Sequence, residues 1–105
     1  MYNSLFTEFE CGECGWSGTG EMQFKYGNLR RNEYVIGSKI IWGRVQVGES
    51  VETAVVADAV AICPRCHAMH DCDIFIRNGQ IVRAERSTGA YDYVHGEGFY
   101  VILEK

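Results

Sequence analysis

Two Cys-x-x-Cys stretches, Cys11-Gly12-Glu13-Cys14 and Cys63-Pro64-Arg65-Cys66, are the most informative part of this 105-residue sequence. The two-residue spacing lets a tight turn aim both sulfurs at one ion while backbone N–H groups point at them. Two such turns that meet face to face predict a closed tetrahedral site of four thiolates, which suits zinc and also iron. The predicted metal ligands are Cys11, Cys14, Cys63 and Cys66.

Other interpretations of the two pairs are two unrelated buried cysteine pairs, or one thioredoxin-like redox pair with a bystander. A redox pair of that kind opens a long helix in an alternating strand–helix chain, and no strong helix is predicted after either pair. The 48 residues between the pairs outnumber the roughly 15–20 of the commonest two-pair spacing. We therefore expect the linker to hold structure of its own.

A fifth cysteine, Cys72, makes the cysteine count odd, so a secreted disulfide framework would leave one thiol over. The first ten residues lack the basic region and the apolar stretch of a secretory signal. No apolar run approaches the roughly 18 residues of a transmembrane helix. We therefore expect a cytoplasmic protein with no membrane partner, in a reducing compartment where disulfides are rare.

The composition is that of a packed globule, with 47% hydrophobic and 23% charged residues. A chain of this length predicts a single domain over residues 1–105. The formal charge is −4, and four thiolates holding one divalent cation would take it to −6. An acidic chain of this kind disfavours strong non-specific binding to nucleic acid or to an anionic membrane.

Period-two alternation of apolar and polar residues dominates the chain and predicts a mainly β fold. Asn78-Gly79 is the strongest hairpin signal. We expect two β-hairpin halves that share one four-thiolate site, a small additional antiparallel sheet from residues 33–62, and a loop at 87–98. The predicted strands are residues 5–10, 21–26, 33–36, 39–42, 53–62, 72–77, 80–86 and 99–103, with a short segment at 44–47.

A weak internal repeat appears when the chain is shifted by 52 residues, because Cys11 and Cys14 then fall on Cys63 and Cys66. The agreement continues without a gap, with Gly27 on Gly79 among the matches. Each half, 5–34 and 57–86, then consists of strand, cysteine turn, strand, glycine turn and strand. Self-similarity of this kind is typical of a repeated supersecondary unit, although any two amphipathic hairpins share some of it. A true repeat predicts a pseudo-twofold axis near the metal.

The residues Cys11-Gly12-Glu13-Cys14-Gly15 and Cys63-Pro64-Arg65-Cys66 resemble the knuckles of zinc ribbons and rubredoxin-like proteins. The resemblance covers about ten residues and singles out no family. It implies a β-rich fold with the four cysteines as ligands. Rubredoxins usually have glycine after the second pair, where this chain has His67. That departure, and a chain about twice their size, make an electron-transfer iron site less expected than zinc.

His67, His70, Asp71 and Cys72 crowd after the second pair. They could form a second metal site or exchange with a thiolate at the first. The plainer interpretation, which we favour, is two solvated loop histidines followed by Cys72, which starts a strand and packs inward as a small hydrophobic residue.

A basic patch interleaved with aromatic residues lies between residues 24 and 44. Its rings could stack on exposed bases while its cations hold phosphates, but we favour a solvated sheet face whose rings point into the core. The patch consists of Lys25, Arg30, Arg31, Lys39 and Arg44, among Phe24, Tyr26, Tyr34 and Trp42.

No catalytic residue is predicted. Asp92 and His95 lie near each other, but no nucleophile is indicated beside them. A site filled by four cysteines leaves no open position for water activation. We therefore expect a non-enzymatic module in which zinc is structural and another protein is the partner. A nucleic-acid-binding zinc ribbon is the second hypothesis, and a rubredoxin-like iron protein is the third.

Overall fold

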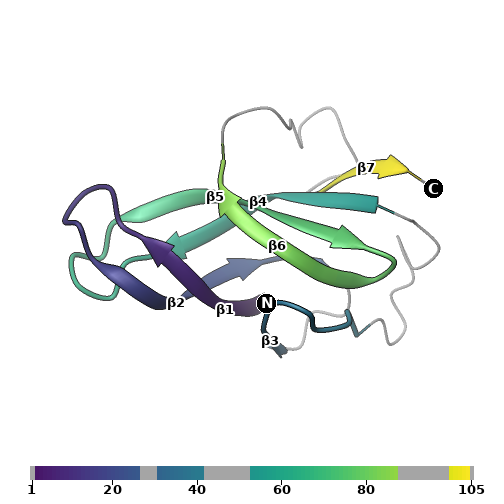
Figure 1. The fold of residues 1–105 in the computed structure, drawn as a ribbon, viewed down its shortest axis with the longest axis horizontal. Helices are drawn as coiled ribbons and strands as arrows, with labels where there is room; N and C mark the ends of the chain where they lie inside the picture. The colour runs from purple at the N-terminus through teal and green to yellow at the C-terminus, as the bar shows by residue number, and fades with distance from the viewer. Residues whose placement is uncertain (1, 27–30, 42–52, 88–99, 105) are drawn as a thin grey trace.

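The computed structural model describes residues 2–26, 31–41, 53–87 and 100–104. Within these ranges every regular element is a strand and no helix occurs, so the predicted mainly β fold is confirmed (Figure 1). No helix in this part of the chain is long and apolar enough to cross a membrane. The strands are β1 (Asn3–Glu10), β2 (Ser17–Phe24), β3 (Glu33–Tyr34), β4 (Thr53–Ile62), β5 (Met69–Arg77), β6 (Gln80–Arg86) and β7 (Tyr100–Glu104).

The seven strands of the described residues join one curled sheet in the order β3-β1-β2-β4-β5-β6, and β7 pairs with β4. The pair β1–β3 is parallel, and the other pairs are antiparallel. Strand β4 is central, because β5 pairs along one edge while β7 and β2 share the other. The turns β1–β2 and β4–β5 project from the same end of the molecule (Figure 1).

The expected small additional sheet from residues 33–62 is not separate in the described residues. Glu33–Tyr34 pairs with β1, and Thr53–Ile62 is the centre of the main sheet. Among the described residues, the strands predicted at 33–36 and 39–42 do not form as expected, because β3 ends at Tyr34, a turn follows it and Lys39 bridges to Gln80. The predictions for residues 44–47 and for almost all of 87–98 lie outside the described residues.

The hairpin predicted at Asn78-Gly79 is confirmed as the connection between β5 and β6. Both residues have positive φ, 51° and 74°, as the primed turns that match strand twist require. The strand predicted at 99–103 is β7, and that predicted at 53–62 is β4. Two strands begin earlier than expected, because β2 and β5 start directly after the cysteine turns, at Ser17 and Met69.

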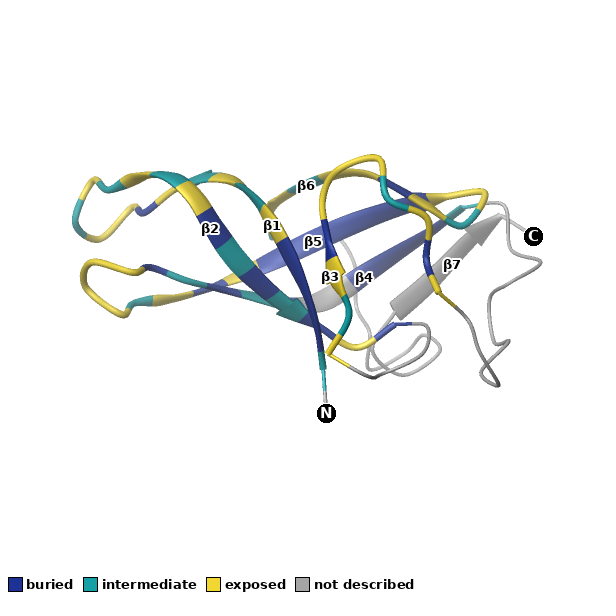
Figure 2. Ribbon diagram, turned by 90° about the horizontal axis from the view of Figure 1, so that it is seen from below, coloured by how far each residue is buried: buried dark blue, intermediate teal, exposed yellow. Residues whose placement is uncertain are grey.

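The hydrophobic core lies inside the curl of the sheet, where buried segments of β1, β2, β4 and β5 face one another (Figure 2). Alternation along β2 places Met22 and Phe24 in this core, as the period-two pattern predicts. Five consecutive residues of β5, Cys72–Ile76, are buried, so both faces of that stretch are covered. The exposed residues concentrate at the turns (Figure 2).

The register of the two cysteine-bearing hairpins agrees at a spacing of 52 residues. Glu10 opposite Ser17 in the first hairpin corresponds to Ile62 opposite Met69 in the second. The correspondence continues for three more pairs, until a register shift in β4 between Val56 and Ala59. The single domain and the repeat remain our proposals, and this shared register supports the repeat.

Candidate metal centre

The first cysteine turn, residues 11–16, is closed by its own backbone. The Cys11 N–H donates to the Trp16 carbonyl at 2.7 Å, and the Gly15 N–H donates to the Cys11 carbonyl at 2.9 Å. Gly15 has a φ of 79°, in the left-handed region that glycine enters without steric cost. These bonds let β1 reverse into β2 while both thiols of the turn stay on one side.

The second cysteine turn, residues 63–68, repeats this pattern. Its Cys63 N–H donates to the Ala68 carbonyl and its His67 N–H to the Cys63 carbonyl, both at 2.9 Å. His67 takes the left-handed position with a φ of 65°. The N–H groups of Arg65 and Cys66 also point at the Cys63 sulfur, at 3.4 and 3.5 Å.

The two turns bring four sulfurs together, since the Sγ atoms of Cys11, Cys14, Cys63 and Cys66 all lie within 4.8 Å of one another. Cys11 is 3.7 Å from Cys66 and Cys14 is 3.6 Å from Cys63, so each short contact joins one turn to the other. A tetrahedral ion with metal–sulfur bonds of about 2.3 Å needs sulfurs about 3.8 Å apart. The cluster therefore fits one tetrahedral metal ion. The thiols are free, and their spacing is far above the roughly 2.05 Å of a disulfide.

The four thiols differ in exposure. Cys11 and Cys63 are buried, Cys14 is half-buried and Cys66 is exposed. Burial favours the neutral thiol of Cys63, but N–H donors from Cys66 and Arg65 outweigh it and lower its pKa to about 6. A lowered pKa favours the thiolate of Cys63, the form in which cysteine binds a metal ion.

The two histidines that were predicted to lie in a solvated loop differ in burial. His67 is exposed, but His70 is buried in β5, so the prediction is wrong for His70. Its Nε2 lies 3.3 Å from the Cys11 sulfur, and its Nδ1 lies 3.2 Å from Nη2 of Arg86. In the sequence, the one indication of this contact was that His70 follows closely after Cys66. Alternation along β5 turns the side chain of His70 inward.

Cys72 is buried in the core, as predicted, but it is the fourth residue of β5 and not its first. Among the described residues, the four cysteines are the group of His, Cys, Asp and Glu side chains that could hold an ion. A second site at His67, His70, Asp71 and Cys72 is therefore not supported.

The described residues include only part of the predicted basic patch. Its cations Lys25, Arg31 and Lys39 are exposed, while Arg30 and Arg44 lie outside the described residues, as do Asp92 and His95. Three of its four rings belong to the core, as the favoured interpretation predicts, and so cannot stack on a base. They are Phe24, Tyr26 and Tyr34; Trp42 lies outside the described residues.

Comparisons with protein-family models, with curated proteins and with solved structures give no significant match. The class of protein therefore rests on the fold and on the site alone. The chain is an all-strand protein in its described residues, with a four-cysteine cluster that could hold a metal ion.

Proposed function

We propose that the protein is a non-enzymatic module that binds one structural zinc ion through Cys11, Cys14, Cys63 and Cys66. The observation that carries this proposal is the convergence of four sulfurs from turns 52 residues apart, at the spacing of a tetrahedral site. Four cysteine ligands leave no open coordination position, so zinc here is structural and activates no water.

A structural role also follows from where the cysteines lie. One ligand pair lies at the tip of the β1–β2 hairpin and the other at the tip of the β4–β5 hairpin. Among the described residues, the two hairpins pair directly only through a three-residue contact between β2 and β4. An ion held at their tips would fasten the two hairpins together. Structural zinc sites carry about 10–16 kcal/mol of apparent binding free energy, which is comparable with the whole stability of a domain, about 5–15 kcal/mol.

The surface that we assign to a protein partner is the outer row, a line of four residues across four strands. Directly opposed residues of paired strands point to the same face, and Phe6, Glu21, Ile62 and Met69 are opposed in turn. Met69 is 70% exposed and Phe6 is 36% exposed. The row thus has an exposed apolar side chain at each end, with the half-buried Glu21 and Ile62 between them. We assign it to a partner because exposed apolar surface marks interaction sites.

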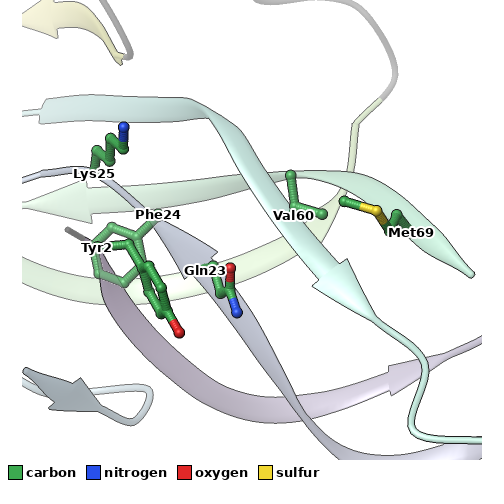
Figure 3. A pocket seen from close by; sticks show the side chains of 6 residues that line it. All are labelled: Tyr2, Gln23, Phe24, Lys25, Val60 and Met69. Atoms are coloured by element: carbon green, nitrogen blue, oxygen red, sulfur yellow. The ribbon is translucent and has the colours of Figure 1, made fainter. Parts of the chain in front are cut away.

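Two hollows flank the outer row. One, of about 370 Å³, lies beside the second cysteine turn and is lined by Phe6, Glu21, Ile62 and Pro64, among others. The other lies at the opposite end of β2 (Figure 3). In Figure 3, Met69 and Val60 meet over β4 and β5, and Lys25 and Gln23 supply polar groups. Such hollows suit the side chains of a docking protein.

Metal analysis of the purified protein tests the site. We expect one zinc per chain and a colourless solution, with loss of the native circular dichroism spectrum on treatment with a strong chelator. Ferric iron in a four-sulfur site is coloured, so a visible absorption band with one iron per chain would support the rubredoxin-like alternative.

Interaction through the outer row is tested with Met69→Glu and with Val82→Glu as a matched control, because Val82 is an exposed apolar residue of β6, outside the row. A partner captured by crosslinking should be lost with Met69→Glu and retained with Val82→Glu. Equal retention in both variants would contradict the assignment of this surface.

A nucleic-acid-binding zinc ribbon is the alternative that the exposed cations Lys25, Arg31 and Lys39 leave open. The burial of three aromatic rings and the formal charge of −4 argue against it. We expect no binding to random oligonucleotides at low ionic strength. Binding that weakens steeply with added salt would favour this alternative.

A further inference from the structure

A chain of polar contacts runs from Arg86 through His70 to Cys11. Arg86, the last residue of β6, places Nη2 3.2 Å from Nδ1 of His70. On the other side of the ring, Nε2 lies 3.3 Å from the Cys11 sulfur. His70 and the Cys11 thiol are both buried, so water does not compete freely for these contacts.

The chemistry of arginine decides which nitrogen of His70 donates a hydrogen bond and which one accepts. A guanidinium has only N–H donors, so Nδ1 of His70 must accept from Arg86 and carries no proton. The ring proton then lies on Nε2, which donates to the sulfur of Cys11. Through His70, the Cys11 thiolate therefore receives a hydrogen bond, and the positive charge of Arg86 lies on the far side of the ring.

The first cysteine turn has room for Arg86 because residue 12 is glycine. A Cβ built on Gly12 would lie 2.7 Å from Nη1 of Arg86, closer than such atoms approach one another. The guanidinium thus rests against the backbone between Cys11 and Cys14, and not only against the histidine.

The first cysteine turn has this arrangement and the second does not, although the backbones of the two turns are alike. At the spacing of 52 residues, His70 corresponds to Gly18, Arg86 to Tyr34 and Gly12 to Pro64. The second turn therefore has no equivalent histidine, arginine or glycine. Its buried sulfur, Cys63, takes N–H donors from its own turn instead.

We propose that His70 and Arg86 are positioning residues of the metal centre, which hold the Cys11 thiolate and offset part of the negative charge of the four-thiolate site. This inference rests on the proposed metal site and adds to it. Hydrogen-bond partners of metal ligands orient them, and loss of such partners typically lowers metal affinity about 10–100-fold.

The first test determines which ring nitrogen of His70 carries the proton. In nitrogen-15 NMR spectra of the zinc-loaded protein at pH 7, we expect the proton of His70 on Nε2 and an unprotonated Nδ1. Arg86→Met should weaken this preference while leaving the fold intact, because Arg86 is a surface residue. A wild-type ring protonated on Nδ1 would overturn the proposal.

The second test measures zinc transfer to a chromogenic chelator. His70→Phe should speed transfer about tenfold or more, and His70→Gln, whose amide can still donate, should restore slow transfer. Gly12→Ala should also speed transfer, because its methyl group displaces the Arg86 guanidinium. His67→Asn is the control, since His67 is exposed and asparagine tolerates the same left-handed backbone. Cobalt as a probe should show a sulfur-to-metal absorption at longer wavelength in His70→Phe.

The outcomes separate this inference from the proposed function. If the wild type and all variants hold one zinc per chain but release it at equal rates, the positioning role is wrong and the metal site stands. If the wild type holds no zinc, the proposed function fails first. If His70→Phe does not fold, the zinc-transfer rates of Gly12→Ala and Arg86→Met test the proposal instead. Transfer at the wild-type rate in both variants would overturn it.

Discussion

Gly15 and His67, 52 residues apart, occupy the same position in the two cysteine turns. Each has a left-handed backbone, with φ of 79° and 65°, and each donates its N–H to the carbonyl of the first cysteine of its turn. The geometry is common to both turns, but only glycine enters this conformation without a steric cost. The second turn therefore holds backbone strain that the first turn avoids.

This difference predicts opposite effects of exchanging the two residue types. Gly15→Ala should lower the free energy of unfolding by about 1 kcal/mol, and His67→Gly should leave it unchanged or raise it by up to about 1 kcal/mol, because relief of strain competes with a more flexible unfolded chain. Urea unfolding of the zinc-loaded proteins measures both. A large loss of stability in His67→Gly would mean that the His67 side chain makes a contact of its own.

Gly20 makes room for the ring of Phe9. A Cβ at Gly20 would overlap that ring, which packs against the core and lies 5.4 Å from the ring of Trp16. Gly20→Ala should therefore cost about 1–3 kcal/mol through overpacking, measured by urea unfolding. In a Phe9→Ala background the same change should cost nothing, and an equal cost in both backgrounds would contradict this explanation.

Cys72 is the cysteine outside the four-cysteine cluster, and burial raises the pKa of its thiol from 9.0 to about 11. A thiol with a higher pKa in the folded chain contributes stability at and below pH 9 that is lost as the pH rises towards 11. The stability difference between the wild type and Cys72→Ala should therefore shrink over that range. Zinc content should not change in Cys72→Ala or in Cys72→Ser, and a drop would show that the ligand assignment is wrong.

Asp73 is a buried carboxylate of β5 whose Oδ1 finds no hydrogen-bond partner among the described residues. Burial raises its pKa above the usual 3.8, and the nearby Glu85 acts in the same direction, against a Ser87 hydrogen bond. The charged form thus costs stability at neutral pH, and that cost disappears as the pH falls below the usual carboxyl pKa.

Asp73→Asn should accordingly raise the free energy of unfolding at pH 7 by about 1–2 kcal/mol, with a smaller gain near pH 4. Asp71→Asn is the matched control, because Asp71 is an exposed residue of the same strand and its replacement should change little. Destabilisation by Asp73→Asn at pH 7 would show that the carboxylate has a partner that requires its charge.

The sequence was sufficient to predict the β class and the four cysteines that meet, because alternation and Cys-x-x-Cys spacing are local patterns. Asn78-Gly79 likewise encodes its own turn. The pairing of Glu33–Tyr34 with β1 was not predictable, since a two-residue strand carries no periodicity. The contact of His70 with Cys11 was missed because it joins β5 to a turn 59 residues away, and depends on which way β5 faces.

Metal analysis of the purified protein, combined with thiol counting, shows whether the four cysteines share one metal ion. We expect one zinc per chain in the wild type, and lower metal content together with lower stability in Cys11→Ser and Cys66→Ser. A folded protein that holds no metal, whether its cysteines are free or joined in disulfides, would contradict the shared site, as would either serine variant that retains a full equivalent of zinc at wild-type stability.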